Sequence, residues 1–459
     1  MRRFVPLILI VLVAAVLLGG IMILRGGPKR FGPQNQGYQS QGYQSGEYSS
    51  LESSKQYLRE NGIDCTHENT YSTYKSLSVD PQNPNVLYVG VEGRGVYKSE
   101  DKGLTWQRKI NGIVVYPDSN DKNQLCFPDI SWIYIDPVNS KRLLLITSDI
   151  TTGYIDWPYG ETGGIWESLD GGDNWRQIIS GKINVAGSGT LAVDPKNPNV
   201  IYYPVNPDAP TFKEAPIKES LITKGSVYKT IDGGKNWEEM TLPMLSGLQA
   251  MRIFIDPKNS NHLLFFTQSH DHIYHENGSI TEVFLDEQRV ILETFDGGKT
   301  WNSWSERLPI PYRALFEGDI SLNNFAHMFV RPFLFGPKFP PEETQQKSFY
   351  SIDGGKTFQQ IPYYIWVARY DPYDQQGNHL IGFASENSQV VESKDGGKTW
   401  ERIGTPPELA TSKVRVSYFA WDPKDPNTVY MSGDYGNVWK SIDGGKSWNN
   451  ILDLNKLPR

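Results

Sequence analysis

An eight-residue motif that occurs seven times constrains the fold of this chain more than any other feature. Each copy reads Ser or Thr, a variable residue, Asp, Gly, Gly, two variable residues and then Trp or Phe, except that the first copy has Lys102 in place of the first glycine. Strand-like segments precede and follow each copy, which is typical of a β-hairpin. The copies begin at Ser99, Ser168, Thr230, Thr294, Ser351, Ser393 and Ser441.

The residue types of the motif suit a tight turn. The Asp carboxylate can accept hydrogen bonds from backbone N–H groups later in its own turn. The glycines supply positive φ angles, which residues with a Cβ reach only at a cost. The final aromatic residue begins the returning strand and can pack against the neighbouring unit. We therefore predict that the seven aspartates form turns and are neither acids nor metal ligands; they are Asp101, Asp170, Asp232, Asp296, Asp353, Asp395 and Asp443.

A second turn signal, Asp followed by Pro, lies upstream of six of the motif copies, at Asp80, Asp136, Asp194, Asp256, Asp371 and Asp422. An Asp-Pro step with a nearby Asn or Pro marks a turn between strands. Each unit then reads strand A, Asp-Pro turn, strand B, loop, strand C, motif turn, strand D. Four strands repeated every 42 to 69 residues indicate propeller blades. We predict an all-β, seven-bladed propeller of four-stranded antiparallel blades over residues 63–459.

The pairing of the Asp-Pro turn with the eight-residue motif resembles the Asp-box, or BNR, repeat over about residues 71–459. It is similar to the repeats of sortilin-type luminal domains, photosystem II stability/assembly factors and xyloglucanase-type glycoside hydrolases. Sialidases share the motif but usually have six blades and fewer copies. The resemblance implies the propeller fold. It leaves the activity open, because these families include both enzymes and non-enzymes.

The N-terminus carries an almost unbroken apolar run of 21 residues, 4–24, with Arg2 and Arg3 before it and Arg25 after it. At 1.5 Å per helical residue this run spans about 30 Å, the thickness of a bilayer core. We predict a transmembrane signal-anchor over residues 1–25 that places the propeller outside the cytoplasm. A cleaved signal peptide is the alternative, although its apolar core is usually shorter and ends at a small-residue cleavage site.

Residues 26–50 are rich in Gly, Gln, Ser and Tyr and contain a short repeat, so we expect a flexible linker. A short helix over 51–62 would follow it. An exported chain can form disulfides, and the repeat places Cys65 and Cys126 before strand A of neighbouring blades. A Cys65–Cys126 disulfide is therefore a candidate, with two buried thiols as the alternative. A net charge of −7 gives no electrostatic footprint for nucleic acid.

Length variation in the chain falls on one predicted face of the ring. The A–B and C–D turns are short and uniform, whereas the B–C and D–A connections, on the opposite face, vary widely in length. Variable loops on a rigid scaffold usually mark a binding face. We expect a protein partner or a glycan to bind there. The longest B–C loops carry aromatic residues, among them Tyr154, Trp157, Tyr159, Phe212 and Tyr274.

The densest group of metal-ligating residue types is His270, His272 and His275, with Asp271 and Glu276 among them. In an extended loop His270 and His272 point the same way and His275 could close a site, and imidazole with carboxylate suits zinc. Solvated loop residues are the alternative, because no fourth ligand is assigned. We expect no resident cofactor.

Two carboxylates are candidates for glycoside hydrolysis. The resemblance to xyloglucanases implies a catalytic Asp in the turn after strand B, and Glu92 and Asp434 occupy that position in blades one and seven. Two carboxylates facing a cleft are the minimum for this chemistry. However, Glu replaces Asp at the first position, and those enzymes work between two propellers whereas this chain has room for one.

A sialidase would need an arginine triad and a tyrosine nucleophile, and no spacing among the arginines identifies a triad; those considered are Arg94, Arg252, Arg313, Arg331 and Arg415. No phosphate-binding loop or dinucleotide motif is present. The sequence thus favours a membrane-anchored, extracytoplasmic, non-catalytic binding module of the assembly-factor or sortilin-like kind. A glycoside hydrolase or glycan-binding protein is the alternative.

Overall fold

The chain divides into two compact units, residues 1–46 and 47–459, and every residue described below belongs to the second. The computed structural model of the 459-residue chain describes residues 77–91, 95–113, 116–117, 125–126, 130–147, 164–180, 191–205, 226–240, 248–269, 271–274, 280–283, 291–303, 307, 315–332, 347–411, 416–433 and 437–452. The predicted anchor, linker and short helix over 1–62 lie outside these residues and remain predictions. Within the described ranges, no helix is long and apolar enough to span a bilayer.

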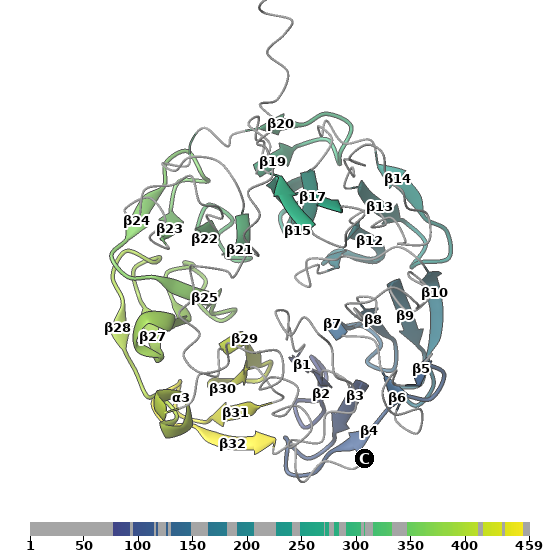
Figure 1. Cartoon of the computed structure of the whole chain (residues 1–459), viewed down its shortest axis with the longest axis horizontal. Helices are drawn as coiled ribbons and strands as arrows, with labels where there is room; N and C mark the ends of the chain where they lie inside the picture. Colours follow the sequence, from purple (N-terminus) through teal and green to yellow (C-terminus); the bar gives the residue numbers. More distant parts are fainter. Residues whose placement is uncertain are drawn as a thin grey trace, which may run out of the picture. The chain divides into compact units, whose positions relative to one another are not determined.

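The predicted seven-bladed propeller is confirmed. Seven four-stranded antiparallel sheets follow one another along the chain and are arranged in a ring (Figure 1). Blades one to three comprise β1 Leu77–Val79, β2 Leu87–Val91, β3 Gly95–Ser99 and β4 Gln107–Arg108; β7 Ile130–Ile135, β8 Leu143–Thr147, β9 Gly164–Ser168 and β10 Arg176–Ser180; and β11 Ala192–Asp194, β12 Asn197–Val205, β13 Ser226–Thr230 and β14 Glu238–Met240.

Blades four to seven repeat the same order. They comprise β15 Leu248–Asp256, β16 Asn259–Ser269, β19 Ile291–Thr294 and β20 Asn302–Ser303; β21 Leu315–Ile320, β22 Met328–Pro332, β23 Ser348–Ser351 and β24 Gln359–Ile361; β25 Ile365–Tyr370, β26 Leu380–Ala384, β27 Gln389–Ser393 and β28 Glu401–Arg402; and β29 Val416–Asp422, β30 Asp425–Gly433, β31 Val438–Ser441 and β32 Asn449–Leu452. Strand A of each blade lies innermost and strand D outermost (Figure 1).

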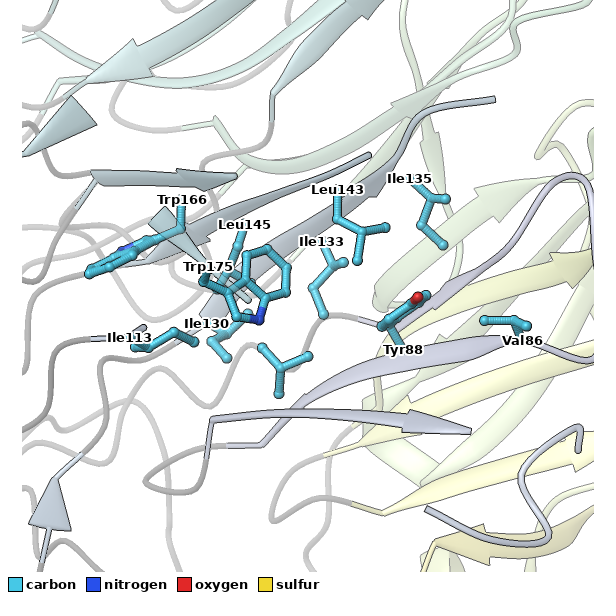
Figure 2. Close-up of a cluster of buried hydrophobic side chains, with 11 residues drawn as sticks. Val86, Tyr88, Ile113, Ile130, Ile133, Ile135, Leu143, Leu145, Trp166 and Trp175 are labelled. Carbon is cyan, nitrogen blue, oxygen red and sulfur yellow. The ribbon is translucent and has the colours of Figure 1, made fainter. Parts of the chain in front are cut away.

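Apolar packing between neighbouring blades forms the core. The described residues contain seven buried hydrophobic clusters, and each joins two adjacent blades. Figure 2 shows the cluster between blades one and two, in which Tyr88 of β2 packs near Ile133 and Leu143 of the next blade, with Trp166 in the same cluster. Strand B is apolar on both faces, as β2, β8 and β26 show by being buried at every position. Each central strand thus serves two interfaces at once.

Side chains join blade seven to blade one and so complete the ring. Trp106 Nε1 donates a hydrogen bond to the backbone oxygen of Ile451 at 3.1 Å. Lys102 Nζ lies 3.3 Å from Asp422 Oδ2, a buried carboxylate. Among the described strands, blade one takes none from the C-terminal region and blade seven none from the N-terminal region. The ring is therefore closed by side-chain contacts and not by an exchanged strand.

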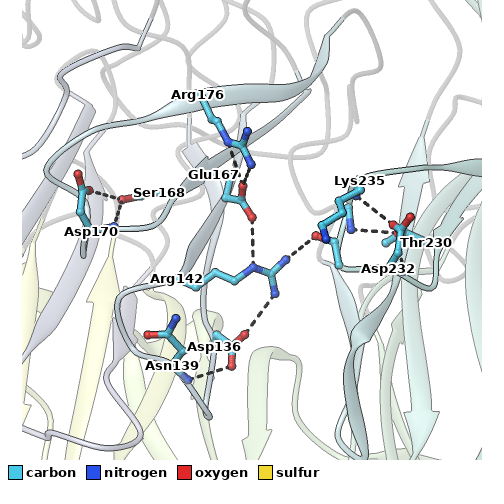
Figure 3. A network of polar contacts seen from close by, with 12 residues as sticks. Asp136, Asn139, Arg142, Glu167, Ser168, Asp170, Arg176, Thr230, Asp232 and Lys235 are labelled. Carbon is cyan, nitrogen blue, oxygen red and sulfur yellow. Dashed lines mark hydrogen bonds and ion pairs between the residues drawn. The ribbon is translucent and has the colours of Figure 1, made fainter.

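The eight-residue motif forms the same hydrogen-bonded turn in every blade. In blade six, Ser393 Oγ donates to Asp395 Oδ1 at 2.9 Å and accepts from Gly397 N at 2.9 Å. Thr399 donates to the same carboxylate through its backbone N at 2.9 Å and its hydroxyl at 2.6 Å. The equivalent four contacts recur in the other six copies. Each aspartate is thereby an acceptor within its own turn (Figure 3 shows those of blades two and three).

The glycine pair of the motif adopts the left-handed conformation that its position suggests. Gly396 and Gly397 have φ angles of 78° and 97°. In blade one, Lys102 occupies the first of these positions with a φ of 60°, a conformation that costs a non-glycine residue about 1 kcal/mol or more. The hydrogen bonds around Asp101 hold this residue in place.

The motif turn is tied to the A–B turn of its own blade. The backbone N–H at the fourth motif position donates to a carbonyl of the A–B turn in all seven blades, as from Gly396 to Asn378 at 2.8 Å and from Lys102 to Asn85 at 2.9 Å. Both turns therefore lie on one face of the ring, which we call the motif face. The B–C and D–A connections lie on the opposite face, which we call the loop face.

Two small hairpins supplement the blades. Strands β17 Asp271–Tyr274 and β18 Ile280–Val283 pair within the B–C connection of blade four, where the sequence indicated only a long loop. Their β-branched residues and the intervening Asn277-Gly278 step are the signal for this hairpin. Strands β5 Tyr116–Pro117 and β6 Leu125–Cys126 pair between blades one and two.

A pair of substitutions in one motif tests the turn. Ser393→Ala leaves the buried Gly397 N–H without its acceptor, so we expect a loss of about 1–3 kcal/mol in the free energy of unfolding. Thr399→Ala removes a donor from an exposed site, where water replaces it, and should cost less than about 1 kcal/mol. Urea unfolding of both variants measures the difference. An equal or larger loss for Thr399→Ala would contradict this account of the turn.

Candidate functional site

The two candidate catalytic carboxylates, Glu92 and Asp434, lie outside the described residues, but the strands that lead to them are described. Val91 ends β2 and pairs with Gly95, and Gly433 ends β30, where its N–H donates to Asn437 at 3.0 Å. Val91 and Val438 belong to one hydrophobic cluster between blades one and seven. The described strand ends that flank the two turns thus lie in adjacent blades.

The other candidates from the sequence are described only in part. His270 and His275 lie outside the described residues, and His272 is placed in β17 by its backbone alone. No group of three or more metal-ligating side chains occurs within the described part of the chain. Cys126 lies in β6 and Cys65 lies outside the described residues, so the disulfide remains a prediction.

Polar and aromatic side chains from five blades meet on the innermost strands. We call Trp132, Arg252, Asp319, Arg369 and Tyr418 the axial cluster. They belong to β7, β15, β21, β25 and β29, the A strands of blades two, four, five, six and seven, which surround the centre of the ring (Figure 1). Arg252 and Arg369 are buried, whereas the other three retain some exposure.

The contacts within the axial cluster run from blade to blade. The guanidinium carbon of Arg369 lies 4.7 Å from the centroid of the Tyr418 ring, and the Trp132 ring meets Tyr418 edge to face with centroids 5.3 Å apart. Arg252 Nη2 lies 4.0 Å from Asp319 Oδ1, and its Nη1 donates to the backbone oxygen of Gly318. Cation–π contacts of this kind are stronger where the groups are shielded from water.

A third arginine, outside the axial cluster, joins blade five to the beginning of blade six. Arg331 of β22 stacks over the ring of Trp366 at 4.1 Å and donates to the hydroxyl of Tyr364 at 3.0 Å. In the antiparallel register of β21 and β22, the backbone of Arg331 stands opposite that of Glu317. Trp366 stands at a register irregularity of β25. Both positions lie near the loop-face ends of their strands.

The electrostatic setting of the axial cluster follows from burial and mixed charge. Burial raises the pKa of Tyr418, the neighbouring Asp319 raises it further, and the Arg369 and Arg252 charges oppose this rise. Burial and Asp319 likewise hold the pKa of Tyr370 well above its ordinary value. Both phenols are therefore neutral near neutral pH.

The arrangement suits recognition more than bond cleavage. Stacked guanidinium groups present in-plane N–H donors to anions and hydroxyls, and half-buried indole and phenol rings suit sugar faces or apolar side chains. Among its described side chains the axial cluster holds one carboxylate, Asp319, whose Oδ2 accepts from the backbone N of Tyr370 at 2.9 Å. Glycoside hydrolysis generally needs two carboxylates. Any such pair would have to come from outside the axial cluster.

Sequence reasoning singled out Arg252 and Arg331 but missed Trp132, Asp319, Arg369 and Tyr418. The missed signal is one of register. Trp132, Arg252 and Tyr418 each stand four residues before the aspartate of their A–B turn, and Arg369 stands two before Asp371. Aligning the A strands on that turn would have placed all of them on the innermost strands.

Fold and cluster together define a seven-bladed β-propeller with an arginine-rich, aromatic group on its innermost strands. No protein-family model matches the chain. Two curated proteins are similar to it: the xyloglucanase of Hypocrea jecorina, 22% identical over 80% of this chain, and a probable oligoxyloglucan-reducing end-specific xyloglucanase of Neosartorya fischeri, 25% identical over 34%. The aligned stretches cover 50% and 15% of these relatives, so this chain spans at most about half of their length.

One solved structure agrees on the propeller fold, and a second is similar over most of its length. An ancestral GH74 enzyme superposes with a TM-score of 0.53 at 16% identity, over 82% of this chain and 46% of its own. YCF48 from Cyanidioschyzon merolae matches over 80% of this chain and 95% of its own at 13% identity, with a TM-score of 0.46. At 16% identity the likeness to the GH74 enzyme concerns the fold alone.

Substituting a glycine beside the axial cluster tests how rigidly the cluster is held. A Cβ at Gly318 would lie 2.5 Å from Phe266 Cε2 and 2.8 Å from the Phe329 oxygen, so Gly318→Ala must displace β21 and Asp319 with it. We expect a loss of about 1–3 kcal/mol in unfolding free energy. Gly354→Ala is the control, because its Cβ meets nothing within 4 Å and only its positive φ adds strain. Chemical denaturation of both variants would refute the prediction if Gly318→Ala matched the wild type.

Proposed function

We propose that this chain is a membrane-anchored, extracytoplasmic, non-catalytic binding module that holds its ligand at the loop face, above the axial cluster. The observation that carries the proposal is the convergence of two stacked arginines, two aromatic rings and one carboxylate from five blades. Such a group of side chains offers recognition without a carboxylate pair for hydrolysis.

The contrast between the two faces supports the same assignment. On the motif face, the aspartates and the Ser or Thr hydroxyls are engaged within their own turns. The hydrogen bonds from Asn174 lower the pKa of Asp170 to about 2, so this carboxylate stays ionised as an acceptor and is poorly suited to proton transfer. The loop face carries the variable connections, where binding residues are usually found.

The anchoring part of the proposal rests on the N-terminal sequence. The 21-residue apolar run at 4–24 is long enough to span a bilayer, and residues 26–50 have the composition of a tether. A propeller held in this way would stand outside the cytoplasm, where both protein partners and glycans occur.

Exchange of one arginine in the axial cluster tests the binding site. The purified full-length protein is screened against a polysaccharide panel that includes xyloglucan, and against solubilised membrane proteins. Arg369→Gln should weaken any binding found by about tenfold or more, because a shielded cation–π contact and charged donors are lost. Arg402→Gln, on the outermost strand of the same blade, is the exposed control and should bind as the wild type does. Equal binding by all three proteins would place the site elsewhere.

A glycoside hydrolase is the second candidate function. Its specific support is the likeness to xyloglucanases, together with the described strand ends before Glu92 and Asp434, which lie in adjacent blades. Because one propeller spans about half of the Hypocrea jecorina relative, hydrolysis would need a site that a single ring can complete.

Turnover assays separate the two functions. If the protein is a hydrolase, xyloglucan oligosaccharides should be cleaved, and Glu92→Gln or Asp434→Asn should lower kcat by at least about a hundredfold because general acid–base or nucleophilic catalysis is lost. If it is a binding module, as we propose, the wild type shows binding without cleavage. Cleavage that both substitutions abolish would overturn the non-catalytic assignment.

A further inference from the structure

One position on the motif face carries a basic residue in four blades, and in blades two, four and six this residue lies between two carboxylates. Arg142 in blade two, His262 in blade four and His379 in blade six each stand immediately before the buried Leu of strand B. Each lies between the aspartate of its own A–B turn and a glutamate of strand C. The equivalent residue of blade five is His327, whose Nδ1 lies 2.7 Å from the backbone oxygen of Gly377 in blade six.

Blade two shows this bridge with a permanent charge. Arg142 donates to Asp136 Oδ2 at 3.2 Å through Nη1 and to Glu167 Oε1 at 3.1 Å through Nε (Figure 3). Its Nη2 donates to the backbone oxygen of Gly233 in blade three at 2.7 Å. An arginine stays protonated at every pH at which the protein folds. This bridge therefore does not depend on pH within that range.

Blade four builds the bridge with an imidazole. His262 Nδ1 lies 3.1 Å from Asp256 Oδ2, and its Nε2 lies 2.9 Å from Glu293 Oε1. The ring stacks on Phe295 of the motif turn with centroids 4.4 Å apart and meets Phe325 of blade five edge to face at 5.1 Å. A histidine whose two nitrogens both face carboxylates satisfies both contacts only as the imidazolium, because both must donate.

Blade six repeats the arrangement. His379 Nδ1 lies 2.7 Å from Asp371 Oδ2, and its Nε2 lies 3.4 Å from Glu392 Oε2. Two further charges are close: Asp374 accepts from the backbone N of His379 at 2.7 Å, and Lys394 Nζ lies 2.5 Å from the other oxygen of Glu392. Carboxylates thus outnumber cations around this imidazole as well.

We propose that His262 and His379 form pH-dependent bridges within blade four and blade six, respectively, which stabilise these blades in acid and weaken as the pH rises. Once an imidazole is neutral, one of its two nitrogens has no proton to donate, and two carboxylates remain close together without a cation between them. The protein would therefore be most firmly folded at mildly acidic pH.

The direction of the pH dependence follows from the surroundings of the two rings. Burial favours the neutral imidazole, but the hydrogen bonds and charges of Glu293 and Asp256 outweigh it and raise the pKa of His262 above its usual value. Asp371 and Glu392 do the same for the pKa of His379. Since the pKa is higher in the folded state, the stabilisation is complete below the unfolded value, about 6.5, and is lost as the pH rises through the folded value.

The bridges lie on the strands that carry the axial cluster. Asp256 ends β15, the strand of Arg252, and Asp371 follows β25, the strand of Arg369. Loosening either A–B turn would release the motif-face end of a strand whose middle holds a stacked or ion-paired arginine. A change in the protonation of either histidine can therefore alter the positions of side chains in the axial cluster.

Replacing both histidines by arginine, the residue of blade two, tests the proposal. Urea unfolding of the full-length protein is measured between about pH 5.5 and pH 8.5 for the wild type and for His262→Arg/His379→Arg. The wild-type folding constant should fall as the pH rises, by roughly tenfold per histidine for each unit by which its pKa is raised. The double variant should show a flatter profile than the wild type.

Identical pH profiles for the wild type and the double variant would overturn the proposal. If the arginine variant does not fold, the proposal is tested by proton NMR titration of the wild-type imidazoles. The variants His262→Gln and His379→Gln are used to assign the two imidazole resonances. Both resonances should titrate above about pH 6.5. Titration of either histidine at or below that value would refute its bridge, whether or not the propeller binds a ligand.

Discussion

The structure depends on apolar packing between twisted sheets that have no solvent-facing side of their own. A blade buries one face against the preceding blade and the other against the next, so strand B is buried at every position in blades one, two and six. A blade of this kind could not stand alone in water, because half of its core would be exposed. Seven clusters between seven pairs of neighbours make the ring a single cooperative unit.

This packing leaves the polar chemistry to the two ends of the strands and to the innermost strands. At one end, the eight-residue motif and the A–B turn use their polar groups on each other. At the innermost strands, arginines, aromatic rings and Asp319 occupy positions that no single sheet can supply. The division explains why the most repetitive residues are structural, while the residues suited to recognition differ from blade to blade.

The number of blades and strands was predictable because each turn is determined by residues within its own eight-residue motif. These are the glycines with positive φ, the Asp that accepts hydrogen bonds and the aromatic residue that packs at the next interface. The axial cluster was not, because its members are up to 286 positions apart and meet only once the ring is closed. The histidine bridges escaped notice for a related reason. The A–B turn of blade six is longer than that of blade four, which hides the equivalence of His379 and His262.

Glu92, Asp434, the His270 group and the cysteine pair remain predictions from the sequence, since residues that each of them needs lie outside the described part of the chain. Variable connections of this kind carry no repeated pattern from which a conformation can be read. The structure adds the ends of the strands that lead to Glu92 and Asp434, and these ends lie in adjacent blades.

The absence of an exchanged strand between the first and last described blades gives the ring an unusual freedom. Six times the chain passes from the outermost strand of one blade to the innermost strand of the next. Between blade seven, whose last strand ends at Leu452, and blade one, whose first strand begins at Leu77, the described residues contain no such connection. Apart from that connection, all seven blade boundaries have the same order of strands on either side. A circular permutant that joins these ends and opens the chain between two other blades would preserve every strand pairing, so the order of the blades around the ring, and not the position of the chain ends, carries the architecture.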